Sequence, residues 1–287
     1  EVSNEAAGTS GGFYDEARRG WVAHTSEIPT CRAAFRDNAW NRYRVEARGE
    51  RIRTWVNGAA CADLVDPLDL TGFLGFQVHS FGGDSPAEVR WRDIRLQDLG
   101  RHVWKPIFDG RTLDGWEHRG GGRAEVRDGA LVLTGEQGGA PGFVVAAGLH
   151  SDFALRVEYR AVKGNSGLFF RAVELGRTPA PSGVRGYEVE IDPTRDAGGL
   201  QEPGGRPWVA RLPAEDADRA YRAGDWNVLT VSARAGRIVI HINGEKSVDL
   251  ADDPGRREGR LALQINSRQS DAEFHYRGIA VLSAEPR

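Results

Sequence analysis

The sequence predicts an all-β protein with a sandwich or barrel architecture. Glycine (37 residues) and proline (13) are abundant, and turn residues separate short stretches of alternating apolar and polar residues along the whole chain. Only DEARRGW (residues 15–21) and PAEDADRAYRAGDW (residues 213–226) have a helix-like pattern. At 287 residues, the chain can hold two domains of ordinary size or one large β-domain.

The composition argues against several classes of protein. The net charge is only -3 and lysine occurs only at Lys105, Lys163 and Lys246, so we expect no nucleic acid partner. The longest apolar runs are far shorter than the ~20 residues that span a bilayer, so we expect no membrane span. A glutamate stands first without a charged and apolar leader, and we expect that the true start of the chain has been removed.

The chain has two cysteines, Cys31 and Cys61, which are too few for a disulfide scaffold and lack the spacing of metal ligands. Either they form one disulfide bond or they are two small buried hydrophobic residues. No convincing nucleotide-binding fingerprint, zinc motif or nucleophile elbow occurs. The sequence therefore predicts neither a cofactor nor a metal site.

A long internal repeat divides the chain. Residues 38–59 match residues 224–245 without a gap, and both copies carry an Asn-Gly pair between two predicted strands, which is a strong hairpin signal. The match continues upstream, where residues 1–13 align with residues 188–200. Downstream, LGFQVHS and VRWRDIRL align with LALQINS and FHYRGIAV. We therefore expect two tandem domains, residues 1–99 and residues 102–287.

The first copy begins at the residue equivalent to Glu188, whereas the second copy has a long segment before that glutamate. We expect the first copy to lack its N-terminal half. A half-sandwich exposes strand edges and an apolar face, so we expect a separate polypeptide segment to complete it. The alternative is a first domain rebuilt around fewer strands.

The stretch RGYEVEID (residues 185–192) places three acids on one face of a predicted strand and Tyr187, Val189 and Ile191 on the other. Similar alternation assigns side chains in three further strands. In LALQIN, Gln264 and Asn266 oppose the apolar residues. In GRIVIHING, His241 opposes the core isoleucines, and in NSGLFFR, Arg171 is expected on the polar face. Gly167 either leaves room for a sugar ring or marks a bulge.

If these four strands belong to one sheet, their polar side chains line one groove, with Asn165 and Trp208 as further substrate contacts. The simpler interpretation is a solvated sheet face in which Arg171 makes a structural ion pair. In the first copy, the polar-face residues are Trp55, Gln77 and His79, and the acid row reads Glu1, Ser3, Glu5. The predicted catalytic set in the second copy is Glu188, Glu190, Asp192, Arg171 and His241.

Seven motifs of the second copy resemble the 3-keto-disaccharide hydrolase domain family in order and spacing: IFDGRTLDGW, VRDGALVL, DFALRVEYR, NSGLFFR, GYEVEID, GDWN and LALQIN. The resemblance spans residues 102–284, and the first copy resembles the C-terminal half of the same domain. It implies a concanavalin A-like jelly roll that cleaves glycosides oxidised to a ketone at C3. The second copy has Asn266 at the position where the first copy has His79, so the second copy lacks this histidine.

A C3 ketone acidifies the C2 hydrogen, so a carboxylate or histidine can remove it, and the C1–O bond then breaks by elimination. Added water completes a net hydrolysis. Such a site needs a base near C2, a donor to the ketone and an acid for the leaving oxygen. A separate oxidoreductase would make the keto sugar, and we expect a periplasmic or secreted location.

Three other functions fit the same residues. The spacing of the acids resembles the catalytic strand of the family-16 glycoside hydrolases, which are retaining enzymes. Two tandem copies that do not catalyse would gain avidity as a carbohydrate-binding module. Calcium at the acid row is the third alternative.

Overall fold

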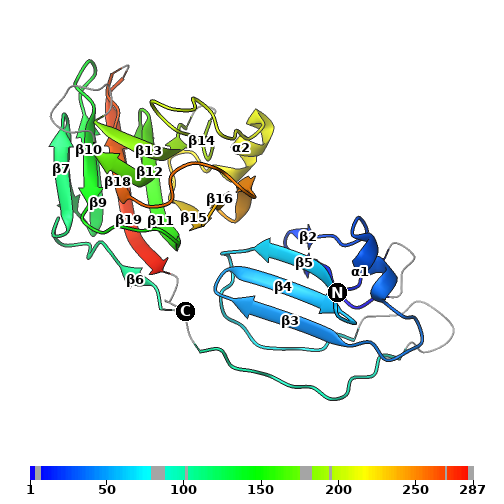
Figure 1. Ribbon diagram of the computed structural model, residues 1–287. Helices are drawn as coiled ribbons and strands as arrows, with labels where there is room; N and C mark the ends of the chain where they lie inside the picture. The colour runs from blue at the N-terminus through cyan, green and yellow to red at the C-terminus, as the bar shows by residue number, and fades with distance from the viewer. Residues whose placement is uncertain are drawn as a thin grey trace. The chain divides into compact units, whose positions relative to one another are not determined.

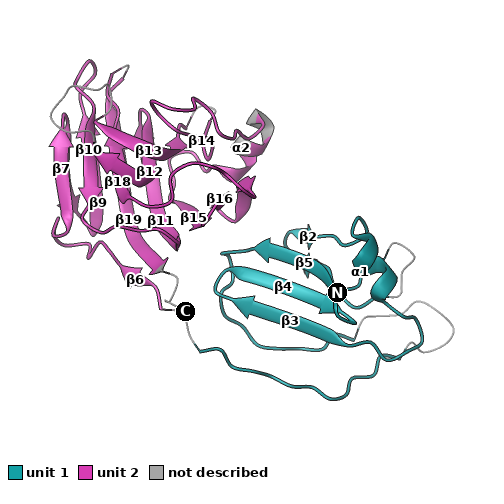
Figure 2. Cartoon of the chain, in the orientation of Figure 1, with its two compact units in different colours: residues 1–102 teal, residues 103–287 magenta. Residues whose placement is uncertain are grey.

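The structure is a computed structural model that describes residues 1–3, 8–78, 88–100, 103–174, 183–193, 196–268 and 270–283. Within these residues, nineteen strands accompany two short helices, which confirms the all-β prediction (Figure 1). The chain divides into two compact units, residues 1–102 and residues 103–287 (Figure 2).

The second unit is a jelly-roll sandwich of two antiparallel sheets. One sheet has six strands in the order β14 (Leu200–Gln201), β13 (Val184–Ile191), β12 (Ser166–Glu174), β18 (Arg260–Ile265), β10 (Gly142–Ala146) and β7 (Trp116–Gly120). Spatial neighbours such as β12 and β18 are far apart in sequence, so the chain repeatedly crosses between the sheets. This sheet carries the acidic row.

The other sheet contains β17 (Glu245–Leu250), β16 (Arg237–Ile242), β15 (Asn227–Arg234), β11 (Phe153–Lys163), β19 (Ala272–Ser283), β9 (Ala130–Gly135) and β8 (Arg123–Arg127), in that order. A further strand, β6 (Lys105–Pro106), pairs with β19. The helix α2 (Ala214–Ala220) lies within the stretch predicted to be helical. β11 pairs with β15 on one edge and with β19 on the other, so it is central to this sheet.

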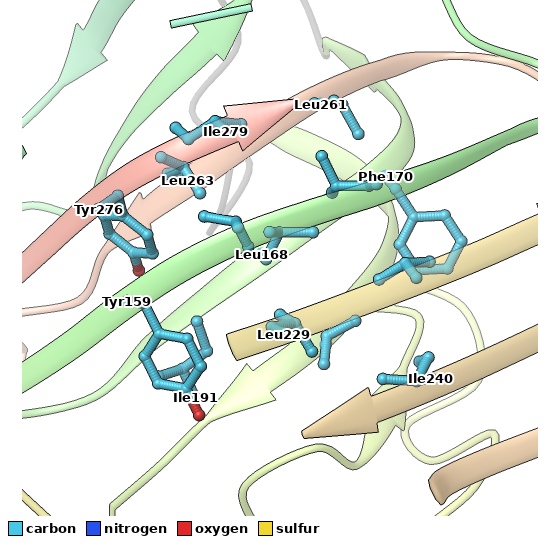
Figure 3. Packing of buried hydrophobic residues seen from close by; sticks show 14 of the residues in the cluster. Tyr159, Leu168, Phe170, Ile191, Leu229, Ile240, Leu261, Leu263, Tyr276 and Ile279 are labelled. Carbon is cyan, nitrogen blue, oxygen red and sulfur yellow. The ribbon is translucent and has the colours of Figure 1, made fainter. Parts of the chain in front are cut away.

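The core lies between the two sheets, and both contribute large apolar side chains to it (Figure 3). Leu168, Phe170 and Leu263 come from the six-stranded sheet, whereas Tyr159 and Tyr276 come from the opposite one. Burying one such side chain stabilises the fold by about 1.5 to 3 kcal/mol. The core therefore fixes which face of each strand points outward.

The first unit is smaller. Its strands β1 (Phe13–Asp15) and β2 (Gly20–Ala23) form a hairpin, and β3 (Tyr43–Arg48), β4 (Arg51–Val56) and β5 (Ala59–Val65) form a three-stranded sheet. The predicted helix at residues 15–21 is wrong, because this stretch forms the turn between β1 and β2. Instead, α1 (Pro29–Ala34) is helical and is the repeat equivalent of α2.

Cys31 and Cys61 form a disulfide bond that joins α1 to β5. Both side chains are buried and pack with Val56 in the small core of the first unit. The repeat places Ala217 and Ser247 at the equivalent positions of the second unit. The disulfide is therefore specific to the smaller unit, where a small core supplies little stability of its own.

A pair of asparagines shows the repeat at the level of single hydrogen bonds. In the first unit, Asn57 Nδ2 donates to Ala34 O at 2.7 Å and to Asn41 Oδ1 at 2.8 Å. Asn57 stands at the apex of the Asn-Gly hairpin with a φ of 49°, a conformation that asparagine tolerates better than most residues. These bonds tie the C-terminus of α1 to the β4–β5 turn.

The second unit repeats this arrangement. Asn243 Nδ2 donates to Ala220 O at 2.7 Å and to Asn227 Oδ1 at 2.8 Å, and the φ of Asn243 is 51°. The same local fold therefore occurs in both units around the same residues.

Reduction of the disulfide should destabilise the first unit selectively. The bond closes a loop with a sequence separation of 30, for which the chain-entropy estimate is about 3 to 4 kcal/mol. Calorimetry with and without reductant should shift one unfolding transition downward and leave the transition of the second unit in place. A Cys31→Ala/Cys61→Ser variant should reproduce the shift without reductant, and an unmoved pair of transitions would contradict the prediction.

Candidate functional site

The acidic row lies on β13 at one end of the six-stranded sheet. Tyr187, Val189 and Ile191 enter the core, and Glu188 and Glu190 take the opposite face, so the predicted alternation is confirmed. Both glutamates are nevertheless buried, whereas Asp192 follows the end of the strand and is half-buried. A row of acids on a solvated sheet face would be exposed, so the simpler interpretation does not describe this pair.

Side-chain amides surround the carboxyl group of Glu190. Asn165 Nδ2 donates to Oε1 and Gln201 Nε2 donates to Oε2. Asn266 Nδ2 donates in turn to Asn165 Oδ1 at 3.0 Å, and these two asparagines form a bridge between the segments that flank β12 and β18. The structure thus brings four polar residues from separate segments together: the predicted Glu190, Asn165 and Asn266, and Gln201, which was not predicted.

Burial sets the protonation of both acids. It raises the pKa of Glu190 to about 7; the carboxylates of Asp192 and Asp196 act in the same direction, and the amides of Asn165 and Gln201 oppose it. Burial also raises the pKa of Glu188 well above its usual range, with a further contribution from the charge of Glu190. Burial therefore favours the protonated form of Glu188, and Glu190 exchanges its proton readily near neutral pH.

Gly167 provides the space that Glu188 occupies. A Cβ atom at this position would lie 2.0 Å from Glu188 Oε1. The residue pairs regularly with Glu190, and the bulge of β12 lies further along, between Phe170 and Val173. Neither predicted role of Gly167 is therefore correct, because the room is filled by a carboxyl group and the backbone is regular.

Gln264 continues the same row on the next strand. Leu168 pairs with Leu263, which places Gln264 beside Gly167, and Gln264 itself pairs with Phe143 on β10. Beyond it, the outward face carries a buried apolar cluster separate from the main core: Phe143, Val145, Phe169, Ala172, Val184 and Ala262. Polar and apolar halves therefore lie side by side on this face.

Trp208 packs over Gly199, and the backbone of Gly199 is hydrogen-bonded to that of Glu190. Glu190 N donates to Gly199 O at 2.9 Å, and a Cβ atom at Gly199 would lie 2.8 Å from Trp208 Cζ3. The guanidinium of Arg211 lies 4.1 Å from the centroid of the Trp208 ring and forms an ion pair with Asp196 at 2.8 Å. Trp208 as a whole residue is half-buried.

Sequence reasoning missed Gln201, Asp196 and Arg211. Gln201 lies in a two-residue strand, which is too short for alternation to be detected. Asp196 and Arg211 lie outside the strands, in segments whose approach to Glu190 depends on the tertiary fold. The repeat offered one signal for the segment that contains Gln201. The residues GGL directly before Gln201 align with GGF in the first copy.

The predicted position of Arg171 is wrong. It lies at the bulge of β12 with a φ of 48°, and its guanidinium is buried away from the acidic row. It donates to three backbone carbonyl oxygens, those of Ser151 (2.8 Å), Ala235 (2.8 Å) and Arg256 (3.2 Å). Arg171 therefore links three loops through its hydrogen bonds. The prediction that it lies on the polar face was wrong because the bulge interrupts the alternation of side chains along β12.

The predicted position of His241 is also wrong. It lies on β16, which belongs to the other sheet, and it points away from the core isoleucines Ile240 and Ile242. The core separates it from the carboxyl groups of Glu188 and Glu190. Alternation assigned the correct face of the strand but could not assign the strand to a sheet.

Two of the three predicted sugar contacts of the first unit, Trp55 and Gln77, lie within the described residues. Trp55 lies between the guanidinium groups of Arg44 and Arg53, at 4.6 and 5.3 Å from its ring centroid. Gln77 is exposed in a segment without strand structure, and His79 lies outside the described residues.

Trp21 was missed as the repeat equivalent of Trp208. A Cβ atom at Gly12 would lie 3.0 Å from Trp21 Cζ3, as Gly199 lies beneath Trp208. Across the described part of the chain, no three His, Cys, Asp or Glu side chains form a group that would hold a metal ion.

The fold and the row of buried acids define a jelly-roll protein with an acid–amide site on one sheet. The chain belongs to the family of 3-keto-alpha-glucoside-1,2-lyase-like domains, whose family model matches residues 2–97 and residues 103–282. The two matches confirm the predicted family and the tandem arrangement. The family relates the chain to carbohydrates. A comparison with curated proteins found no match.

Solved structures share the sandwich at low sequence identity. A protein of unknown function with a galectin-like fold from Bacillus subtilis is 17% identical with a TM-score of 0.50, and the match covers 63% of this chain and 96% of that one. A carbohydrate binding module from Bacillus subtilis is 17% identical with a TM-score of 0.46, over 59% of this chain and 96% of the other. At this identity, only the fold is shared.

Replacing Glu190 with glutamine should alter the pH dependence of stability. Because the pKa of Glu190 is raised on folding, its contribution is present below about pH 4.5 and is lost as the pH rises through about 7. Glu190→Gln should therefore gain stability relative to wild type above pH 7, by at most about 3 kcal/mol. Denaturant unfolding at pH 4 and pH 8 measures this, and Glu136→Gln, at an exposed glutamate, is the control. Equal effects of Glu190→Gln at both pH values would contradict the raised pKa.

Proposed function

We propose that the second unit cleaves glycosides that carry a ketone at C3 of glucose. The observation that supports this most directly is the pair of buried carboxyl groups with raised pKa values, Glu188 and Glu190, in a member of this family. Glu190 acts as the general base and takes the proton from C2. An acid–base group works best when its pKa lies near the working pH.

The remaining steps use groups next to Glu190. The electron pair from the C2–H bond forms an enolate with the C3 carbonyl, and its collapse breaks the C1–O bond. Glu188, whose pKa burial raises well above its usual range, donates its proton to the leaving oxygen. Addition of water to the resulting double bond gives net hydrolysis; without it, the product is that of a lyase.

The amides supply binding and orientation. Asn165, Gln201, Gln264 and Asn266 are half-buried beside the two carboxyls, and their donors and acceptors suit sugar hydroxyls and the developing enolate oxygen. Trp208 offers part of its ring to the apolar face of a sugar. A mixture of amides, acids and an aromatic ring is consistent with a carbohydrate ligand.

The first unit takes no part in this chemistry in the proposal. The repeat puts Ser3 in the place of Glu190, and Ser3 N donates to Ser10 Oγ at 3.0 Å. A hydroxyl group does not replace a carboxylate as a base at neutral pH. Trp21 packs over Gly12 as Trp208 packs over Gly199, so we assign the first unit to sugar binding.

We infer a periplasmic or secreted location from the disulfide bond, because such bonds persist in oxidising compartments. In the described residues, no helix is long and apolar enough to cross a bilayer. A glycan substrate is accessible in such a compartment.

Glu190→Gln should lower kcat on a 3-keto-glycoside by about 10²- to 10⁴-fold and leave substrate binding nearly unchanged, because the amide keeps the shape and loses the base. The wild-type rate should rise as the pH passes about 7, where Glu190 loses its proton. Sugar release and C2-deuterium exchange measure both effects, with Glu136→Gln as the control. An unchanged rate would reject the assignment. Cleavage of ordinary β-glucans would support a family-16-like hydrolase, and binding without any product would support a carbohydrate-binding module.

Gly167→Ala should impair the reaction through Glu188. The added methyl group takes the place of Glu188 Oε1, so the side chain must swing away while the strand stays paired. We expect kcat to fall at least about tenfold with little change in unfolding temperature. Gly72→Ala adds the same group where nothing lies within 4 Å and should have no effect. Full activity of Gly167→Ala would exclude Glu188 from the mechanism.

A further inference from the structure

A hairpin of the second unit carries two residues of the candidate site. Its strand β14 pairs with β13 through only two residues, Leu200 and Gln201, and the chain returns beside it at Ala210. Gln201 donates to Glu190, and Trp208 lies on the returning segment. Such a short edge strand gains few main-chain hydrogen bonds, so the position of the hairpin depends on other contacts.

Arg206, in the turn of this hairpin, provides such a contact. Its Nη1 donates to Asp253 Oδ2 at 2.6 Å and its Nη2 donates to Asp253 Oδ1 at 3.0 Å, while its Nε donates to Glu202 Oε2 at 2.8 Å. Glu202 N donates to Arg206 O at 2.9 Å, which closes the turn. These three residues form an arginine clamp that ties the turn to the loop between β17 and β18.

Asp253 is a well-fixed partner for the arginine. Its carboxylate is buried and also accepts hydrogen bonds from Tyr187 Oη and, at 2.9 Å, from Gly255 N. Tyr187 belongs to the core, where its ring stacks on that of Phe170 with the centroids 5.1 Å apart. Burial acts to raise the pKa of Asp253, but its hydrogen bonds, those from Arg206 and Tyr187 foremost, hold it at about 2. The carboxylate therefore stays charged from about pH 4 upward.

The first unit contains the same arrangement. Arg19 Nη2 donates to Asp66 Oδ2 at 2.7 Å, and Arg19 Nε donates to Asp15. Extended without a gap, the upstream repeat aligns Arg19 with Arg206 and Asp15 with Glu202. The hairpin of β1 and β2 is therefore held at its turn by an arginine clamp of its own.

The acceptor aspartates of the two clamps are equivalent as well. Asp66 and Asp253 each precede a proline. Each donates its backbone N–H to an equivalent carbonyl oxygen, that of Glu50 at 2.7 Å and that of Gly236 at 2.8 Å. The arginine clamp therefore attaches the hairpin to the same backbone position in both units.

The two hairpins also share a tryptophan. The tripeptide WVA follows the turn in each, at residues 21–23 and at residues 208–210. The clamp occurs in the first unit although Ser3 stands there in the place of Glu190. Its shared role is therefore to place the hairpin and not to act on the acid by its charge.

We propose that Arg206 is a positioning residue, which through Asp253 holds Gln201 and Trp208 beside the carboxyl group of Glu190. When the clamp is broken, the hairpin moves away from β13 and water reaches that carboxyl group. The effect on the reaction rate rests on the proposed function. The effect on the carboxyl group is independent of catalysis.

Few charged groups lie around Glu190. Glu188 and Asp192 lie on its own strand or directly after it, and Asp196 follows with its partner Arg211. The adjacent outward residues of β12 and β18 are uncharged: Gly167 and Gln264.

A looser hairpin should lower the pKa of Glu190. Burial is the largest cause of its raised value, so entering water should shift it from about 7 toward 4.5. Loss of the Gln201 hydrogen bond acts in the opposite direction, but this effect is smaller than that of burial. By charge alone, removal of the Arg206 cation would raise the pKa and removal of the Asp253 anion would lower it. The direction of the change therefore separates positioning from charge.

NMR titration of ¹³C-labelled glutamate carboxyl groups in the intact chain tests the proposal. We expect Arg206→Gln and Asp253→Asn each to lower the pKa of Glu190 by at least about 1, and the double variant to lower it no further. Arg277→Gln should leave it unchanged. This control is matched, because Arg277 forms an ion pair with Glu158 at 2.8 Å and its side chain is 45% exposed, compared with 38% for Arg206.

Arg206→Lys removes the two-pronged contact but keeps the charge, so it should also lower the pKa of Glu190. On a 3-keto-glycoside, Arg206→Gln should lower kcat at least about tenfold. A raised or unchanged pKa of Glu190 in Arg206→Gln and Arg206→Lys would overturn the proposal. If the pKa falls as expected but the wild-type protein cleaves no keto-glycoside, the proposed function fails and the positioning role stands.

Discussion

The alternation of side chains across β13 is the constraint on which the candidate site depends. Tyr187, Val189 and Ile191 must enter the core of the second unit, so Glu188 and Glu190 are held on the outward face. The neighbouring strands and the 196–211 segment then bury both carboxyls. The same packing that stabilises the sandwich therefore creates two acids with raised pKa values.

The site balances two opposing effects on the charge of Glu190. Removal from water disfavours the carboxylate, whereas the amides of Asn165 and Gln201 stabilise it. The result is a pKa of about 7, between that of a solvated glutamate and that of a fully desolvated one. Both effects on Glu188, its burial and the charge of Glu190, raise its pKa, and Gly167 leaves the space that its carboxyl group occupies.

Sequence reasoning predicted strand faces well and spatial neighbours less well. The alternation around Val189 and the repeat between the Asn57 and Asn243 hairpins are local patterns, and the structure has both. The positions of Arg171 and His241 were wrong because a bulge and the assignment of a strand to a sheet are decided by tertiary packing. Gln201 and Asp196 reach Glu190 only through the turns after β13, which carry no periodic signal.

The central claim is that Glu190 exchanges a proton near neutral pH and that burial also raises the pKa of Glu188. Titration of ¹³C-labelled glutamate carboxyl groups by NMR tests this directly, with Glu190→Gln used to assign the signal. We predict one carboxyl that titrates near pH 7 and a second whose pKa also lies well above the ordinary glutamate range. If both titrate near the ordinary glutamate value of 4.5, the account is wrong.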